Sequence, residues 1–308
     1  MADKIATRAS YGKALTELGA ENQNIIVMDA DLSGSTQTGK FAAKFPERFI
    51  NAGIAECNMM GMAAGLAISG KTVFASTFAM FAAGRAYEII RNSIGYTHAN
   101  VKVCATHAGL TVGEDGASHQ CLEDIALMRA IPGMTVINPA DDVSARKLIK
   151  AAAAFDGPCY IRLGRAAVPV LYEEDQQVEI GKALKLKDGK DAVIIATGIM
   201  VDKALQAAEL LKAEGLEVGV IDMHTIKPID EEAIIAAAKT GAIVTVEEHS
   251  VMGGMGSAVA EVVCQKAPCR MKIVGVQDSF GESGTPDALL EKYHLTAADI
   301  AEAVKSIK

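Results

Sequence analysis

Short apolar runs rich in Val and Ile alternate with longer helical patterns along the first half of this 308-residue chain. The apolar runs predict strands at residues 25–28, 72–75, 101–105, 135–137 and 159–163. The intervening patterns predict helices at residues 8–18, 55–68, 82–94, 122–130 and 141–154. Because strands that alternate with helices form largely parallel sheets, we expect an open α/β domain.

The pattern changes after Arg165 and then begins again. Residues 168–190 are charged and weakly periodic, so we interpret them as a linker. A second series follows, with strands predicted at 192–196, 218–221, 242–247 and 271–276 and helices at 202–214, 230–239 and 256–265. The chain is therefore predicted to form two doubly wound α/β domains, residues 1–167 and residues 191–308.

Composition and charge exclude several classes of partner. The formal charge is −8 and no run of Lys or Arg is present, which argues against a nucleic-acid partner. The N-terminal residues lack the apolar region of a signal peptide, and the longest apolar run, at 192–201, is only about ten residues, too short for a membrane span. Six cysteines form no C-x-x-C pair, so we expect reduced thiols and a cytoplasmic protein without a membrane partner.

Residues 107–120 concentrate more chemistry than any other stretch. They contain His107, His119, Glu114, Asp115 and three glycines, and they follow the predicted strand 101–105. Glycine lets the backbone approach a ligand closely, and histidine and carboxylate side chains bind hydroxyls and move protons near neutral pH. Ligands of open α/β sheets lie at the carboxyl ends of the strands, so this segment is predicted to be half of an active site.

Glu56, Phe78 and Phe81 are further candidates. Glu56 opens a helix that is apolar nearly all round and is therefore predicted to be buried, although a glutamate in a first turn is most often solvated. Buried carboxyl groups are typical of proton-transfer sites. Phe78 and Phe81 lie three residues apart, which fits either core packing or a wall for a flat heterocycle.

Two arginines and a polar loop complete the candidates. Asp31 and Ser35 lie in a loop after the predicted strand 25–28, where they serve either turn formation or ligand binding. Arg8 and Arg165 are either surface cations or planar forks for a phosphate. The sequence contains no P-loop, nucleophile elbow, zinc-ligand spacing or convincing magnesium motif, so no metal site is assigned.

Together these motifs resemble the transketolase family. Gly-Ile-Ala-Glu at 53–56, Thr-Phe-x-x-Phe at 77–81 and the His-rich segment at 106–120 match the order and spacing of its pyrimidine-binding domain. Two further motifs match the family: Asp-Leu-x-x-Ser at 31–35, and Lys-Ile-Ala-Thr-Arg at 4–8, which ends in Arg8. The second α/β unit resembles the family's C-terminal domain, so the resemblance covers essentially the whole chain.

The resemblance implies thiamine diphosphate chemistry, in which a two-carbon ketol unit moves from a ketose phosphate to an aldose phosphate, as in the pentose phosphate pathway. Glu56 would hydrogen-bond N1′ of the aminopyrimidine, Phe78 and Phe81 would face its ring, and Asp31 would lie near the cofactor. The catalytic residues would be Glu56 with two histidines. His107 would contact the sugar near the reacting carbons, and His119 would contact sugar oxygens or phosphate and shuttle protons.

The same resemblance implies substrate contacts and shows one departure. Asp115 would hydrogen-bond a sugar hydroxyl. The terminal phosphate would be bound by Arg8, Ser35 and Arg165. Where the family has a tyrosine three residues after the second phenylalanine, this chain has Gly84, followed by an arginine.

A larger departure is a missing motif. The family binds the diphosphate and a divalent metal through Gly-Asp-Gly…Asn in an N-terminal domain, and the nearest string here, Glu-Asp-Gly at 114–116, lacks the asparagine. The resemblance therefore implies the C-terminal subunit of a split transketolase. A separate N-terminal subunit would bind Mg²⁺ or a similar metal in an α2β2 heterotetramer, and the lone chain would be inactive. The alternatives are the β-subunit of a 2-oxoacid dehydrogenase, a 1-deoxyxylulose-5-phosphate synthase-like enzyme, and an inactive regulatory subunit.

Overall fold

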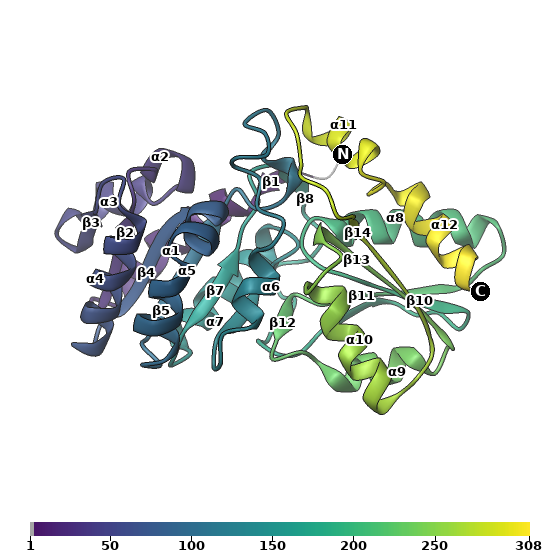
Figure 1. The fold of residues 1–308 in the computed structure, drawn as a ribbon. Coiled ribbons are helices and arrows are strands. Elements are labelled where there is room, and N and C mark those ends of the chain that lie inside the picture. Colours follow the sequence, from purple (N-terminus) through teal and green to yellow (C-terminus); the bar gives the residue numbers. More distant parts are fainter. Residues whose placement is uncertain (1–2) are drawn as a thin grey trace.

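The first domain of the computed structural model, which describes residues 3–308, is built on a seven-stranded sheet (Figure 1). The strand order is β12-β6-β7-β5-β4-β2-β3, and all neighbours are parallel except β12 with β6. The strands are β2 (Ile25–Asp29), β3 (Phe49–Asn51), β4 (Thr72–Phe78), β5 (Val101–Thr106), β6 (Thr135–Ile137), β7 (Cys159–Arg162) and β12 (Thr225–Lys227). The helices are α1 (Thr7–Glu21), α2 (Ser33–Thr36), α3 (Gly39–Lys44), α4 (Glu56–Ile68), α5 (Tyr87–Ile89), α6 (Asp124–Arg129) and α7 (Asp142–Ala154).

The second domain has a five-stranded sheet in the order β14-β13-β10-β11-β9, in which only β9 is antiparallel to its neighbour. Its strands are β9 (Leu184–Lys187), β10 (Ala192–Ala196), β11 (Val218–Asp222), β13 (Ala242–Ser250) and β14 (Arg270–Val276). Its helices are α8 (Met200–Ala213), α9 (Glu231–Ala238), α10 (Met255–Lys266), α11 (Pro286–Lys292) and α12 (Ala297–Ile307). Helices α8 and α12 pack together on one face and α9 and α10 on the other (Figure 1). The prediction of two α/β domains with largely parallel sheets is confirmed.

The chain crosses the predicted domain boundary in two ways. Strand β9 lies inside residues 168–190, the predicted linker, because Leu and Lys alternate there with the period of a strand. Strand β12, from the second half of the chain, adds to the edge of the first sheet. A short sheet of β1 (Lys4–Ala6) and β8 (Ala167–Pro169) ties the two ends of the first domain together. Residues 1 and 2, which open the predicted first domain, lie outside the described residues.

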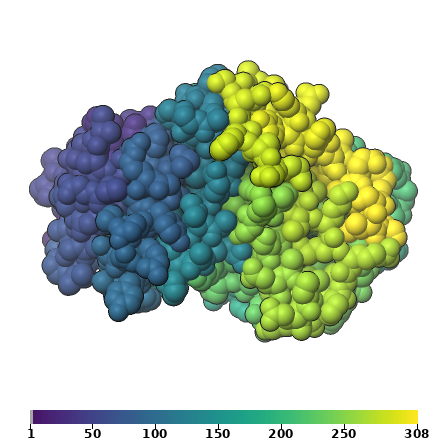
Figure 2. All heavy atoms as spheres, viewed as in Figure 1, coloured from purple at the N-terminus to yellow at the C-terminus, as the bar shows by residue number. Residues whose placement is uncertain are grey.

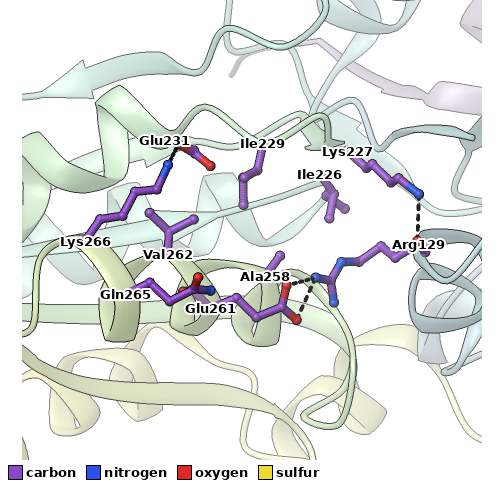
Figure 3. Close-up of a pocket in the computed structure, with 10 residues that line it drawn as sticks. All are labelled: Arg129, Ile226, Lys227, Ile229, Glu231, Ala258, Glu261, Val262, Gln265 and Lys266. Carbon is purple, nitrogen blue, oxygen red and sulfur yellow. Dashed lines mark hydrogen bonds and ion pairs between the residues drawn. The ribbon is translucent and has the colours of Figure 1, made fainter. Parts of the chain in front are cut away.

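Charged side chains link the domains along a pocket of about 320 Å³ (Figure 3). The Arg129 guanidinium from α6 donates to both carboxylate oxygens of Glu261 in α10, at 2.9 Å each. Lys227 of β12 donates to the backbone oxygens of Arg129 and Ile131 at 2.8 and 2.6 Å. These contacts connect α6 with α10 and with β12, and they pair the Arg129 and Lys227 charges within the chain.

Residues 82–94 do not form the single α-helix that the pattern predicts. Two π-helical segments, Met80–Arg85 and Ile90–Gly95, flank the short helix α5. The backbone N–H of Ala86 donates to the oxygen of Phe81, five residues earlier, at 3.2 Å. Such wide turns are rare and are frequent at functional sites. Apolar periodicity does not distinguish a π turn from an α turn over so few residues.

Helix α4 is not buried on all sides, which corrects the prediction. Met59 and Met60 face the core, but Gly61 and Ile68 face solvent, and Ile68 is 69% exposed. Ile54, just before the helix, is 80% exposed. A helix that is apolar all round indicates contact on both sides, but the pattern does not say whether the second contact belongs to the same chain. Within residues 3–308 no helix is long and apolar enough to cross a membrane.

Candidate active site

Four rings form a cluster at the carboxyl ends of β4 and β5. Phe78 is the last residue of β4, and its ring stacks on His107, just after β5, with centroids 3.8 Å apart. Phe81 stacks on Phe78 at 5.6 Å, and His119 meets Phe81 edge-on at 5.5 Å. The structure thus brings together residues that the sequence predicted from two separate motifs.

Arg8 and Ser35 adjoin this cluster on the His107 side. The Arg8 Nη1 donates to the backbone oxygen of Ser35 at 2.8 Å and lies 3.4 Å from Nε2 of His107. The His107 Nδ1 is 2.9 Å from the Thr106 hydroxyl. Burial, followed by the positive charges of Arg8 and Arg165, lowers the pKa of His107 to about 3. The imidazole is therefore a neutral hydrogen-bonding group near neutral pH.

Two guanidinium groups, those of Arg8 and Arg165, lie at this end of the site, and the exposed carboxylate of Glu114 pairs with the second. Burial and the nearby Arg165 lower the pKa of Arg8. Arg165 donates to the backbone oxygen of Val112 and to the carboxylate of Glu114, at 3.0 Å in the latter case. Glu114 is exposed, and its bonds to a backbone N–H and to Arg165 lower the pKa of its carboxyl. An anion between the two arginines would relieve their repulsion, and planar forks suit a tetrahedral oxyanion.

Glu56 is buried and is linked to the ring cluster through Arg85. It is the first residue of α4, its side chain is only 2% exposed, and its Oε2 accepts from Nη1 of Arg85 at 2.8 Å. The Arg85 guanidinium lies over the Phe81 ring, 4.6 Å from the centroid. The predicted burial of Glu56 is confirmed. No role was predicted for Arg85, because its partner lies 29 residues away in the chain.

Asp31 and Asp115 lie outside this cluster. Asp31 is exposed with φ of 65°, and its backbone N–H and carboxylate bond the Asn51 side chain at 3.1 and 3.3 Å. Asp115 is exposed, and its carboxylate makes no hydrogen bond or ion pair with residues 3–308. Within the same residues, no group of three His, Cys, Asp or Glu side chains could hold a metal ion. The roles predicted for both aspartates stay predictions.

The second domain holds the segment 107–120 in place. Glu248 of β13 is buried and accepts from the Thr111 N–H at 2.5 Å. Gly109 has φ of 82°, and a Cβ there would lie 2.3 Å from the carboxyl group of Glu248. Nε2 of Gln120 donates to the oxygen of Glu282 at 2.9 Å, so the segment before α11 packs against the loop (Figure 2). No role was predicted for Glu248, although Glu-Glu-His at the end of the predicted strand 242–247 was a usable signal.

Comparisons with known proteins agree over both domains. Residues 3–170 match the family model "Transketolase, pyrimidine binding domain", and residues 181–300 match "Transketolase, C-terminal domain". A protein of Methanocaldococcus jannaschii named "Putative transketolase C-terminal section" is 53% identical over 96% of this chain and 94% of its own length. "6-deoxy-6-sulfo-D-fructose transketolase subunit SqwH" of a Clostridium species is 42% identical over 97% and 94%. The solved structure "Split gene transketolase, inactive beta4 tetramer" is 58% identical with a TM-score of 0.93, over 98% of each chain.

Replacing Glu248 tests how the second domain holds the loop. Burial raises the pKa of Glu248 from 4.5 to about 7, so the folded state binds a proton more tightly than the unfolded chain. Its contribution to the free energy of unfolding is full below pH 4.5 and is lost as the pH rises through 7. Glu248→Gln still accepts from Thr111 but does not titrate. Relative to the wild type, we expect this variant to gain up to about 3 kcal/mol between pH 4.5 and 8, measured by urea unfolding.

The matched control is Glu302→Gln, which removes an exposed glutamate of α12. Its difference from the wild type should be nearly constant over the same pH range. A Glu248→Gln difference that is equally flat would show that Glu248 is ionised throughout and would contradict the prediction.

Proposed function

Because this chain belongs to the transketolase family and corresponds to its C-terminal section, we propose that it works with a separate N-terminal subunit in thiamine diphosphate-dependent ketol transfer. The reaction moves a two-carbon unit from a ketose phosphate to an aldose phosphate. The observation that carries the proposal is the buried Glu56 carboxylate, whose partner Arg85 lies over Phe81 in the ring cluster of Phe78, Phe81 and His107. We assign the reaction to pentose phosphates in the cytoplasm on the family resemblance.

The residues present fit the pyrimidine half of the cofactor. Thiamine diphosphate, when bound, would supply a nucleophilic carbon on an electron-withdrawing thiazolium ring. Glu56 offers one buried acceptor for a ring nitrogen, and Phe81 is half-buried with an aromatic face beside it. The Glu56 carboxylate is almost fully removed from water, which strengthens a single hydrogen bond to the ring. We propose that Asp31 lies near the bound cofactor.

The arginine end of the site fits the anionic group of the sugar. Arg8 and Arg165 provide the positive charge, Ser35 lies beside Arg8, and neutral His107 donates or accepts without adding charge. The approach of His107 to Arg8 supports a contact with this group in addition to the predicted contact with the sugar. His119, edge-on to Phe81, retains the proton-shuttle role. The name of the Clostridium relative refers to a sulfo sugar, whose sulfonate is also a tetrahedral oxyanion.

We propose that the N-terminal subunit holds the diphosphate and Mg²⁺ and that the assembly is α2β2. The exposed apolar face of α4 supports a partner surface that begins directly at Glu56. Gly61 and Gly65 lie on this face, and a Cβ at either would meet nothing within 4 Å in the lone chain. Glycine inside a helix costs about 1 kcal/mol relative to alanine, so its presence fits a close approach by another chain.

Glu56→Gln tests the catalytic assignment in the reconstituted complex. We expect ketol transfer to fall at least about 100-fold, because the amide cannot replace a carboxylate in proton transfer. The measurement is a steady-state assay of donor and acceptor sugars, with the wild-type chain alone giving no turnover. Glu88→Gln, an exposed glutamate of α5, is the control and should keep the wild-type rate. An unchanged rate in Glu56→Gln would indicate a structural role.

Arg8→Met tests the anion site. Loss of one charge-assisted contact should raise KM for a phosphorylated aldose by about 10- to 100-fold. The kcat/KM for an uncharged acceptor such as glyceraldehyde should change by less than about twofold, because that sugar has no group for Arg8. Equal losses with both acceptors would place Arg8 elsewhere in the mechanism.

Gly61→Leu tests the partner surface. The lone chain should fold normally, since the added side chain enters open space, but the complex should form at least about tenfold more weakly. Light scattering after size exclusion measures the assembly, and Gln206→Leu on the exposed side of α8 is the control. Wild-type assembly by Gly61→Leu would exclude this face.

A further inference from the structure

We propose that Arg85 is a latch that occupies the pyrimidine position of this site until the cofactor displaces it. The inference rests on the proposed function, because it concerns the same Glu56 and Phe81. Arg85 donates to the Glu56 carboxylate and at the same time covers the Phe81 ring. These are the two contacts that the aminopyrimidine ring is expected to make.

The guanidinium has the chemistry of a stand-in for the ring. It is planar, carries N–H donors at its edge and stacks on aromatic faces. Its Nη1 is 2.8 Å from Glu56 Oε2, and its central carbon is 4.6 Å from the Phe81 centroid. Both contacts use surfaces that a flat heterocycle would need, so Arg85 and the ring cannot occupy them together.

The local backbone places the latch. Arg85 ends the π-helical segment Met80–Arg85, and its backbone oxygen accepts from the thiol of Cys57 in α4 at 3.4 Å. The preceding residue is Gly84, where a Cβ would clash with the end of the Met80 side chain. A wide turn and a glycine thus precede Arg85, which among residues 3–308 is the side chain that bonds Glu56.

Exposure shows which partner moves. The Glu56 side chain is 2% exposed and lies in the first turn of a helix whose Met59 and Met60 are in the core. The Arg85 side chain is 50% exposed, so it can rotate into solvent without disturbing packing. In the lone subunit the pair spares Glu56 from being a buried charge without a partner. In the complex it must open before the ring binds, which weakens apparent affinity.

The test is a titration of thiamine diphosphate with Mg²⁺ into the complex reconstituted with the N-terminal subunit. Arg85→Met keeps the length of the side chain and removes the donors, so the Kd should fall about 3- to 10-fold. Arg85→Lys, which keeps the charge without the plane, should lie between the wild type and Arg85→Met. Arg91→Met, an exposed arginine that bonds Asn92, is the matched control and should bind like the wild type.

A second variant pair separates the latch from general packing. In a Glu56→Gln background the latch loses its carboxylate, so adding Arg85→Met should change the Kd by less than about twofold. In the lone chain, Arg85→Met should lower Tm by roughly 2–4 °C because Glu56 is left unpaired. Glu56→Gln/Arg85→Met should recover that loss.

The outcomes separate the two claims. A wild-type complex that does not bind thiamine diphosphate would overturn the proposed function, and the latch with it. Binding by the wild type that Arg85→Met leaves unchanged or weakens would overturn the latch alone, and would assign Arg85 to supporting the bound ring.

Discussion

A carboxylate that is almost fully removed from water must have a partner, and at Glu56 this requirement organises the ring end of the site. The first turn of α4 fixes the carboxylate, and the core contacts of Met59 fix the helix. The aromatic wall of Phe78 and Phe81 comes from the end of β4 and the π-helical turn that follows. Among residues 3–308 the side chain that bonds this carboxylate is Arg85, which the same turn positions.

The substrate end depends on a different constraint, which is the fixed relation of the two domains. The loop after β5 has no regular structure beyond one short turn, Leu110–Val112. Its position comes from Glu248 beneath it and from the segment before α11 beside it. Arg162 adds to this by bonding Asp124 in its own domain and the backbone oxygen of Glu248 in the other, each at 2.9 Å. The C-terminal domain therefore supports the loop that carries His107 and His119.

The alternation of strands and helices was enough to predict two α/β domains, because period and spacing record which faces are buried. The same patterns failed where burial depends on distant neighbours. Strand β9 is short and half-exposed, and β12 pairs across the domain boundary, so neither has the apolar run of an inner strand. The apolar pattern of α4 predicted a helix buried nearly all round, but one of its two sides is exposed in the lone chain. Motif order located Glu56 and the rings, whereas Arg85 and Glu248 act through partners far along the chain.

The two ends of the site therefore differ in how complete they are. At the anion end, the two arginines, Ser35 and the neutral His107 all belong to this chain, so the charge and the donors for an oxyanion are present without a partner. At the ring end, the chain offers one acceptor and one aromatic wall, and Arg85 fills the space opposite them. Under the proposed function, the lone chain would offer a formed site for the anionic group of the sugar, whereas Arg85 would still fill the position of the cofactor ring. Under the same proposal, the second polypeptide would be required for two reasons, since it would supply the diphosphate contacts and make it favourable for the ring to displace Arg85.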